Sequence, residues 1–448
     1  MSAGVESVGG CLREPCGNSG GCESPGANEG GDFSPRITPP YLIGVYLAIN
    51  AIPDAYLFLD GPSCFPLKSP AIQGNHDWFS AITNVSGRAK CITTQAYPST
   101  VFLSREELYA EALRGIAAYE DAGGVFMSAR PMAAITGQDY ERVVRQAQEE
   151  TSKPMFLVPP KSLQADWLGG YSELLISLAK TLELSGSRTR GKVAVVGYLF
   201  DRNEGDHEGN LMEMRRLLGA MDLDVSSIWL SGSPIDALRR AGEADAIVSL
   251  PYGRKAARIL AKRLGIPLIE TELPLGFGAS ERFLGDIGRA LDRREQAEAV
   301  IDAELSRWAP RLEWVIPFVF QHLRLGFIGD PYLLSGVAEI AEMLGAKLSF
   351  AASSAHDSHL RGQALPIESV IWEPTKIHLA ELISAEIERG LGLLVSCSPE
   401  MPVGVPVVEL GYPSYQSHAL IPRPYLFFSG TVGLVESMSN RLRQEELR

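Results

Sequence analysis

The sequence predicts an α/β fold of three successive Rossmann-like domains, each a parallel sheet flanked by helices. Short apolar runs alternate with amphipathic helical patterns and this alternation restarts twice, which is typical of parallel sheets that helices cover on both faces. A chain of 448 residues is also too long for one core, since domains usually hold about 100–150 residues. We expect domains over residues 37–186, 187–310 and 311–448, after a flexible Gly-, Ser- and Pro-rich tail over residues 1–36.

The first domain is expected to open with a buried helix and a buried strand between Tyr41 and Leu59. This stretch is apolar, but Asn50, Pro53 and Asp54 interrupt it, so it is too broken for a membrane span of about 20 residues. A buried strand that closes on Asp, Gly and Pro predicts a loop at its carboxyl end.

A capping box marks the next helix. Ser104 can cap it and Glu107 follows three residues later. Gly123 and Gly124 supply its stop. The pattern then continues with a strand over 124–129, a helix over 135–150, a strand over 153–160 and a helix over 171–184.

The composition of Ser185–Gly191 is that of a linker, and the alternation restarts after it. The second domain is expected to contain a strand over 191–200, a polar loop over 201–210, a helix over 209–223, a strand over 245–251, a helix over 254–265, an extended run over 266–276 and a helical connector over 281–308. The third is expected to contain a strand, a Gly-Asp-Pro loop, a helix and a strand over 322–350, then strands over 368–374, 392–398 and 405–411 and helices over 378–390 and 431–447.

Composition excludes several classes of protein. The net charge of −13 and the lack of any long Lys/Arg run argue against nucleic-acid binding. No secretory signal and no membrane segment is recognisable, so we expect a cytoplasmic protein whose six cysteines are not a disulfide scaffold. No Walker A or G-x-G-x-x-G motif is present, and no G-x-S-x-G pattern follows a predicted strand, so ATP hydrolysis and dinucleotide binding by this chain are not supported.

The cysteines are the remaining candidates for chemistry. Cys64 lies in a Gly-Pro-Ser-Cys turn after a predicted strand, and Cys91 follows 27 residues later. Thiolates select iron–sulfur clusters or zinc, and two of them are half of the usual set, which a twofold dimer would complete. The alternative is that both are buried small hydrophobic residues. Cys11, Cys16 and Cys22 have no spacing typical of a zinc site, and their role stays open.

The turn LDGPSC resembles the HGPxGC turn of nitrogenase component 1 subunits, and VFMSARPMAAITGQDYERVV resembles the strand–Cys-Pro–helix element of that family. In order and spacing, such similarities extend over roughly residues 40–445. The resemblance implies that Gly61 and Pro62 shape a cofactor-binding turn. It also implies that Cys64 and Cys91 ligate an iron–sulfur cluster, a [4Fe–4S] type at a subunit interface.

Two departures from the family pattern limit this assignment. Arg130 occupies the position of a third cluster ligand, and an arginine cannot ligate iron. Pro251 stands where catalytic nitrogenase subunits hold the molybdenum cofactor through a cysteine. The chain therefore resembles a β-type subunit, a cofactor scaffold or a tetrapyrrole-reductase branch such as dark-operative protochlorophyllide reductase, with no molybdenum cofactor anchored by this chain.

The resemblance implies an oxidoreductase subunit that works by electron relay. A separate ATP-hydrolysing iron protein is expected to dock over the first domain, and electrons pass through the interface cluster to a substrate or cofactor in the interdomain cleft. Arg130, if near the cluster, would favour its reduced state, and His418 lies in a family-like position near the cleft. The partner is a copy or a paralogue, in a dimer or tetramer.

Other functions stay open. The chain can instead be a non-catalytic scaffold for metallocofactor assembly, a cluster-free interaction subunit, or a metal-free ligand-binding protein. Among the remaining candidates, Cys397 is expected to be a packed core residue, His356 and His359 an exposed loop pair, and His76 and Asp77 part of a helix cap.

Overall fold

The computed structural model describes residues 34–62, 72, 76–80, 82, 89–96, 105–135, 137–397 and 404–446. The chain from Ser34 onward forms one compact unit. The predicted N-terminal tail, with Cys11, Cys16 and Cys22, lies outside the described residues, and so does Cys64.

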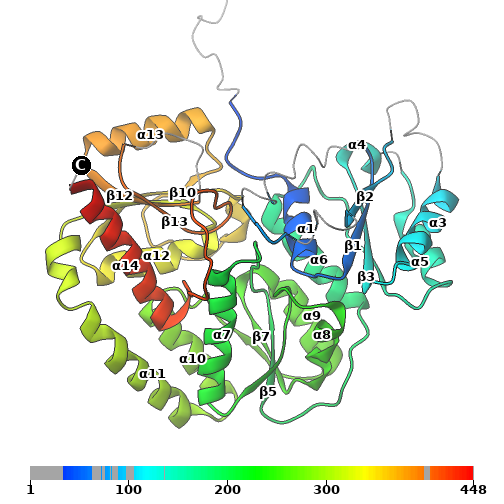
Figure 1. The fold of residues 1–448 in the computed structure, drawn as a ribbon, viewed down its shortest axis with the longest axis horizontal. Coiled ribbons are helices and arrows are strands. Elements are labelled where there is room, and N and C mark those ends of the chain that lie inside the picture. The colour runs from blue at the N-terminus through cyan, green and yellow to red at the C-terminus, as the bar shows by residue number, and fades with distance from the viewer. Residues whose placement is uncertain are drawn as a thin grey trace, which may run out of the picture. The chain divides into compact units, whose positions relative to one another are not determined.

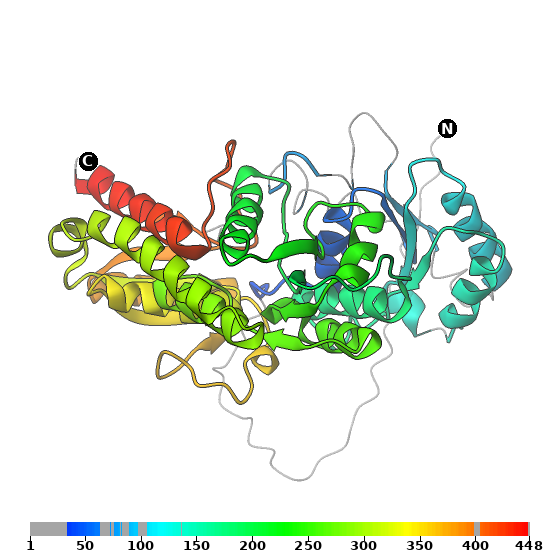
Figure 2. The same ribbon diagram turned by 90° about the horizontal axis from the view of Figure 1, so that it is seen from below.

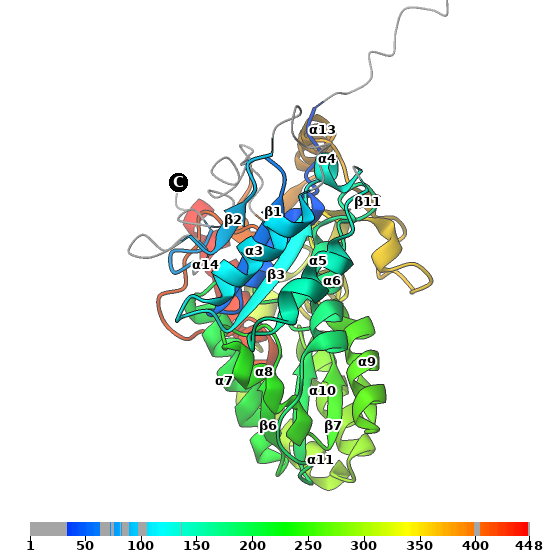
Figure 3. The ribbon, with the colours of Figure 1, turned by 90° about the vertical axis from the view of Figure 1, so that its right-hand side faces the viewer.

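The first sheet is parallel and has the strand order β2-β1-β3-β4. Its strands are β1 (Ala55–Asp60), β2 (Cys91–Thr93), β3 (Gly124–Ala129) and β4 (Met155–Leu157). One face packs on α1 (Tyr41–Asn50) and α6 (Trp167–Thr181), and the other on α3 (Glu106–Ala117) and α5 (Tyr140–Gln148), as Figure 3 shows. A short helix, α4 (Pro131–Ala134), precedes the segment 135–150 that was predicted as one helix, and α5 covers the later part of that segment.

The second sheet is also parallel, in the order β6-β5-β7-β8. It contains β5 (Lys192–Val196), β6 (Asp224–Ile228), β7 (Ala246–Ser249) and β8 (Leu268–Glu270), with helices α7 (Gly205–Ala220), α8 (Ile235–Arg239) and α9 (Arg254–Leu264). Strand β6 was not predicted, because its sequence DVSSI is short and half polar, as suits the edge position that it holds.

The third sheet is a five-stranded parallel sheet in the order β11-β10-β9-β12-β13. It contains β9 (Arg324–Gly329), β10 (Lys347–Ser353), β11 (Ile371–Trp372), β12 (Leu391–Ser396) and β13 (Val407–Glu409), with helices α12 (Pro331–Met343) and α13 (Lys376–Glu388). Three parallel sheets flanked by helices confirm the predicted fold class. The domain boundaries stay a prediction, since one hydrophobic core runs through all three sheets.

Helices between and after the sheets join the second and third of them (Figures 1 and 2). The predicted connector is two helices, α10 (Phe277–Ala290) and α11 (Arg294–Trp308), and the chain ends in α14 (Phe427–Glu446). Helix α14 contacts α10, α11 and α7 as well as β13. The C-terminal segment thus returns to the second sheet, where it forms part of the site described below.

The polar segment 201–210 was predicted as a loop, but α7 begins within it at Gly205. The reason is tertiary. A Cβ on Gly205 would lie 2.3 Å from the carbonyl oxygen of Ile421, and one on Gly209 would lie 2.5 Å from the backbone nitrogen of Pro424. Both glycines lower helix propensity, yet they allow the C-terminal segment to pack directly on the helix backbone. Among the described residues, no helix is both long and apolar enough to cross a membrane.

Candidate functional site

Gly61 and Arg130 meet in the first domain at the carboxyl ends of β1 and β3, and the Arg130 charge also acts on Cys91, the first residue of β2. Gly61 follows β1 with a φ of +134°, and a Cβ there would lie 2.9 Å from the Cβ of Arg130. The Arg130 backbone N–H donates to the Asp60 carbonyl at 2.9 Å, so the two strand ends are joined. Glycine is therefore required both by the backbone conformation and by the arginine side chain that crosses it.

The Cys91 side chain lies on the α1–α6 face of this sheet. Cys91 is paired with Leu57 in the parallel register and belongs to the same buried cluster as α1 and α6. Burial raises the pKa of its thiol to about 12, although the nearby Arg130 charge acts in the opposite direction. The metal-free thiol is thus protonated at neutral pH, and binding a metal here would release its proton.

Arg130 is a buried cation that lacks a carboxylate partner among the described residues. It is 8% exposed, and one terminal nitrogen, Nη2, donates to the Tyr46 hydroxyl at 3.2 Å. Its Nε–H is buried without a hydrogen-bond partner in the part of the chain that the structure describes. A buried guanidinium that is not neutralised is strongly unfavourable, so this corner is suited to an anionic group.

The Asp60 side chain anchors the end of β1 on the face of the sheet that α3 and α5 cover. Its carboxylate accepts hydrogen bonds from the hydroxyls of Thr94 (2.8 Å), Tyr109 (2.9 Å) and Tyr140 (2.8 Å). Burial, together with the Asp60 charge, raises the pKa of both tyrosines, which keeps them as donors. The Thr94 hydroxyl also accepts from the Gly61 backbone N–H at 2.9 Å, so the turn is fixed before any ligand arrives.

One chain supplies only part of the ligand set that a thiolate-ligated cluster needs. Pro62 follows Gly61 in the turn, while Cys64, two residues later, lies outside the described residues. Across the described ranges, no group of three or more His, Cys, Asp or Glu side chains is placed to hold a metal. A cluster here would need Cys64 together with ligands from a second subunit. Cys397 is buried, in agreement with its predicted place in the core.

His418 lies at a second place, in the C-terminal segment beside α7. Its Nδ1 lies 2.7 Å from Oε1 of Glu204, a buried carboxylate whose other oxygen accepts the Ala419 N–H at 2.9 Å. The Trp78 ring stacks on the imidazole, with 3.8 Å between centroids. These described partners of His418 all lie away from the Cys91–Arg130 corner, so the predicted site residues fall into two groups.

Asp201, a residue that the sequence did not single out, is the centre of the second group. It is 2% exposed and contacts His207 Nε2 at 2.5 Å, His76 Nε2 at 3.0 Å and Arg202 at 3.3 Å. Burial acts to raise the pKa of Asp201, but the charges of His207 and Arg202 more than offset this and hold it well below the usual value.

His76 and Asp77 are buried links between distant segments rather than surface residues. His76 Nδ1 lies 2.9 Å from the Ser414 backbone nitrogen, while its other nitrogen meets Asp201. Asp77 accepts from the Asn203 backbone at 3.0 Å and from Asn50 at 2.6 Å. A sequence pattern cannot reveal such contacts as those with Ser414, Asp201 and Asn203, because these partners lie more than 100 residues away along the chain.

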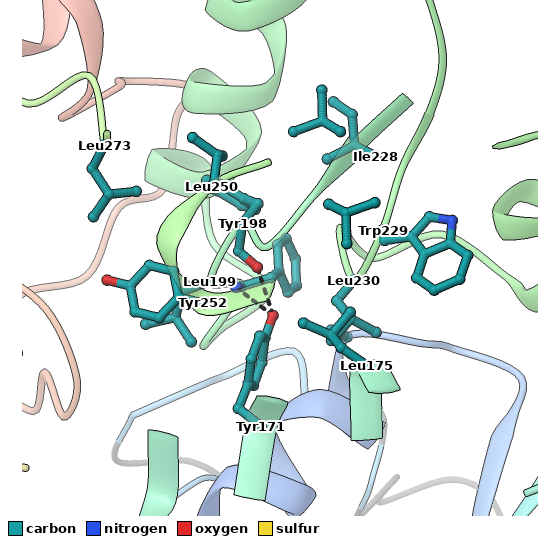
Figure 4. Close-up of a cluster of buried hydrophobic side chains, with 14 of the residues drawn as sticks. Tyr171, Leu175, Tyr198, Leu199, Ile228, Trp229, Leu230, Leu250, Tyr252 and Leu273 are labelled. Carbon is teal, nitrogen blue, oxygen red and sulfur yellow. Dashed lines mark hydrogen bonds between the residues drawn. The ribbon is translucent and has the colours of Figure 1, made fainter. Parts of the chain in front are cut away.

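Aromatic side chains fill the junction between the carboxyl ends of the three sheets. Figure 4 shows Tyr171, from α6, donating to the Tyr198 carbonyl at 2.9 Å. The Tyr171 hydroxyl also accepts from the Phe200 N–H at 3.0 Å. The Tyr252 ring contacts Tyr171 and Tyr332, with centroid distances of 6.5 and 5.0 Å. The predicted interdomain cleft is therefore packed at these positions.

Asp166 and His359 border the same junction. The Asp166 carboxylate caps α6 and contacts His359 Nε2 at 2.9 Å through both oxygens, and it also accepts the His356 N–H at 2.7 Å. His356 lies 3.2 Å from Glu373. Both histidines are half-buried, and the contacts of the His359 ring and of the His356 N–H with Asp166 join α6 to the third sheet, so the prediction of an exposed loop pair was wrong.

Asp330, which caps α12, is a buried acid at this junction. Its oxygens accept the Tyr332 N–H at 2.9 Å and the Tyr252 hydroxyl. Burial raises its pKa to about 6. The carboxyl of an unfolded chain ionises near pH ~3.9, so the folded state is penalised for the buried charge as the pH rises through this interval.

Asp330→Asn is expected to remove this penalty. The stability difference between variant and wild type should grow in favour of the variant by roughly 3 kcal/mol between pH 4 and 7, and then stay level. Urea unfolding at several pH values measures it. Asp357→Asn, at an exposed position, is the control and should show no such rise. A flat difference for Asp330→Asn would contradict the assignment of a raised pKa.

Comparisons with known proteins identify the class to which this fold and site belong. Residues 41–443 match the nitrogenase component 1 type oxidoreductase family, and the chain belongs to that family. The family includes nitrogenases and protochlorophyllide reductases, and the predicted resemblance is confirmed.

The particular relatives are distant. The nitrogenase molybdenum-iron protein beta chain of Frankia alni is 21% identical over 378 residues, 75% of this chain and 70% of the relative. A light-independent protochlorophyllide reductase subunit from Halorhodospira halophila is 28% identical over 206 residues, 44% of this chain and 36% of the relative. A solved structure of nitrogenase Cp1 at pH 6.5 is 17% identical, with a TM-score of 0.74 over 94% of this chain and 96% of that one. At that identity the solved structure shows the fold alone.

Proposed function

We propose that this chain is a subunit of a nitrogenase-like two-component reductase. In this proposal Cys64 and Cys91 supply two thiolates to an iron–sulfur cluster of the [4Fe–4S] type at a subunit interface. A copy or a paralogue completes the ligand set, and a separate ATP-hydrolysing iron protein docks over the first domain. Such a cluster, when bound, accepts and passes on single electrons.

The observation that supports this role most directly is the buried Arg130 guanidinium beside the Cys91 thiol. The guanidinium has no carboxylate partner among the described residues, and an anionic, thiolate-ligated cluster would provide the missing counter-charge. Membership of the family supports the same role, as do relatives described as a nitrogenase beta chain and as part of a protochlorophyllide reductase.

The chain's own residues have three tasks in this role. The Gly61 turn, held by Asp60 and Thr94, fixes the backbone that precedes Cys64 in the sequence. Packing against α1 and α6 keeps water from Cys91. Arg130 lowers the energy of negative charge at the corner, which favours deprotonation of the thiol and also the more negative, reduced state of a cluster.

Iron and acid-labile sulfide analysis after anaerobic purification tests the proposal. We expect about one cluster per dimer in wild type and its loss in the Cys64→Ala/Cys91→Ala double variant. Cys397→Ala is the matched control, since Cys397 is equally buried but belongs to another cluster of side chains. Equal iron in all three proteins would refute the site. If the wild-type chain alone contains no iron, the wild type and the same two variants are compared after co-expression with a paralogous subunit.

Arg130→Gln is expected to lower the midpoint potential of the bound cluster by several tens of millivolts. Loss of a nearby positive charge disfavours the reduced state, and for one electron ~59 mV corresponds to about 1.4 kcal/mol. Redox titration followed by electron paramagnetic resonance measures the shift. Arg142→Gln, on the exposed surface of α5, is the control. An unmoved potential in Arg130→Gln would show that Arg130 does not act on the cluster.

A further inference from the structure

A partly open cavity of about 480 Å³ borders the second group of residues beside His418. It lies between the start of α7, the end of β13, the segment 417–425 and helix α14. Its wall is mainly aliphatic, formed by Val408, Leu410, Leu420, Ile421, Pro424 and Leu434. Cavities of this size and character commonly bind small molecules.

The walls of this cavity are firmly built. Gly205 donates its N–H to the Ala419 carbonyl at 2.8 Å and accepts from the Arg423 N–H at 3.1 Å. The Asn210 side chain accepts the backbone N–H groups of Tyr425 and Leu426, each at 3.0 Å. These hydrogen bonds hold the C-terminal segment against α7, so the cavity is formed before a ligand enters.

Two polar groups border the cavity. Arg202 is 8% exposed, and its terminal nitrogens are paired with Asp201 at 3.3 Å and with Asp206. Its buried Nε–H has no hydrogen-bond partner among the described residues, and an oxygen of Glu204 lies 3.7 Å from it. His418 uses Nδ1 for Glu204. Because the carboxylate accepts, Nδ1 carries the hydrogen, which leaves Nε2 for a ligand.

The charge on the wall decides which ligands fit. The carboxylates of Asp201, Asp206 and Glu409 line the cavity, and only two cations, Arg202 and Arg423, line it with them in the part of the chain that the structure describes. Glu409 is already satisfied by the Ser414 hydroxyl and by backbone N–H groups. The excess negative charge of the wall would repel an anion. An uncharged carbonyl or hydroxyl oxygen can accept a hydrogen bond from Arg202 without this repulsion.

We propose that this cavity binds an uncharged, mainly apolar small molecule that carries a hydroxyl or carbonyl group, which Arg202 Nε and His418 contact. Leu420 and Ile421, whose side chains are exposed, line the cavity on the side from which such a ligand would enter. This inference goes beyond the proposed function and does not depend on a cluster, so either can fail while the other stands.

Isothermal titration calorimetry with 1-naphthol and 1-naphthoate tests the proposal, since the two probes share a ring system and differ in charge at neutral pH. We expect 1-naphthol to bind at about one site per chain and 1-naphthoate at least tenfold more weakly. Equal affinity for the two probes, or no binding of 1-naphthol, would overturn it.

Cavity-filling variants locate the binding. Gly433→Leu adds a side chain on the α14 face that lines the cavity, where a new Cβ meets no atom closer than 3.7 Å, and leucine also favours the helix. We expect it to weaken 1-naphthol binding at least tenfold. Ser437→Leu fills the cavity from the next turn and serves if Gly433→Leu does not fold. Gly285→Leu, on α10 with no atom within 4 Å of the new Cβ, should bind as wild type does. Unchanged binding in a folded cavity-filling variant would place the probe elsewhere and overturn the proposal.

Discussion

Gly170→Ala is expected to prevent folding or to lower the free energy of unfolding by more than about 4 kcal/mol, a loss that few single substitutions cause. Helices α1 and α6 cross with their backbones in contact. A Cβ on Gly170 would lie 2.0 Å from the Tyr41 carbonyl oxygen, and one on Gly44 would lie 1.7 Å from the Trp167 carbonyl oxygen. Backbone atoms cannot move aside as a side chain can, so both helices would have to separate.

Separation of these helices would also disturb the candidate site, because α1 carries Tyr46, whose hydroxyl accepts a hydrogen bond from Arg130. Urea unfolding followed by circular dichroism measures the effect. Gly115→Ala is the matched control, since Gly115 is an exposed glycine of α3 with no atom within 4 Å of a new Cβ. The control should gain up to about 1 kcal/mol from helix propensity. A Gly170→Ala protein as stable as wild type would mean that the two helices are not in this contact.

Asp201→Ala is expected to destabilise the protein by about 3–5 kcal/mol. The substitution removes the one carboxylate shared by His76, His207 and Arg202, so buried polar groups lose a common partner, although Arg202 keeps its contact with Asp206. The loss should affect distant segments together, because His76 also contacts Ser414 of the C-terminal segment. Hydrogen exchange should therefore report faster opening both around His76 and in the C-terminal segment.

The pH dependence of this interaction has a definite sign. The folded pKa of Asp201 is held below that of the unfolded chain, so its contribution is complete above pH ~4 and is lost as the pH falls through the folded value. Asp201→Ala should thus lose less stability than wild type on acidification below pH ~4. Asp236→Ala, at a side chain that is 92% exposed and paired with Arg239, is the control and should change stability by less than about 0.5 kcal/mol. Equal effects of the two substitutions would contradict the central role of Asp201.

Much of the fold could be predicted because its signals are local. The run AYLFLD is typical of a buried strand, and β1 is buried along its whole length. The third sheet begins, as predicted, with a strand, a Gly-Asp-Pro loop and a helix that Asp330 caps. Where prediction failed, the local signal was weak. Strand β6 is half polar, and the first turn of α7 contains glycines that usually disfavour helix.

At the candidate site the sequence singled out Gly61, Arg130 and Cys91, and their role in holding a cluster stays a prediction. Nothing in the sequence indicates that Asp201 gathers His76, His207 and Arg202, since these contacts depend on how separate segments pack. Nor does the sequence indicate that Arg130 is buried without a carboxylate partner in the described chain.

By itself the sequence therefore determined three alternating α/β segments, the family and the candidate thiolates. The tertiary structure alone decided which distant side chains meet, that aromatic rings fill the junction of the three sheets, and that a cavity opens beside His418. The physical reason is that periodicity and capping act over a few residues, whereas contacts such as His76 with Asp201 form only when the whole chain buries its apolar faces.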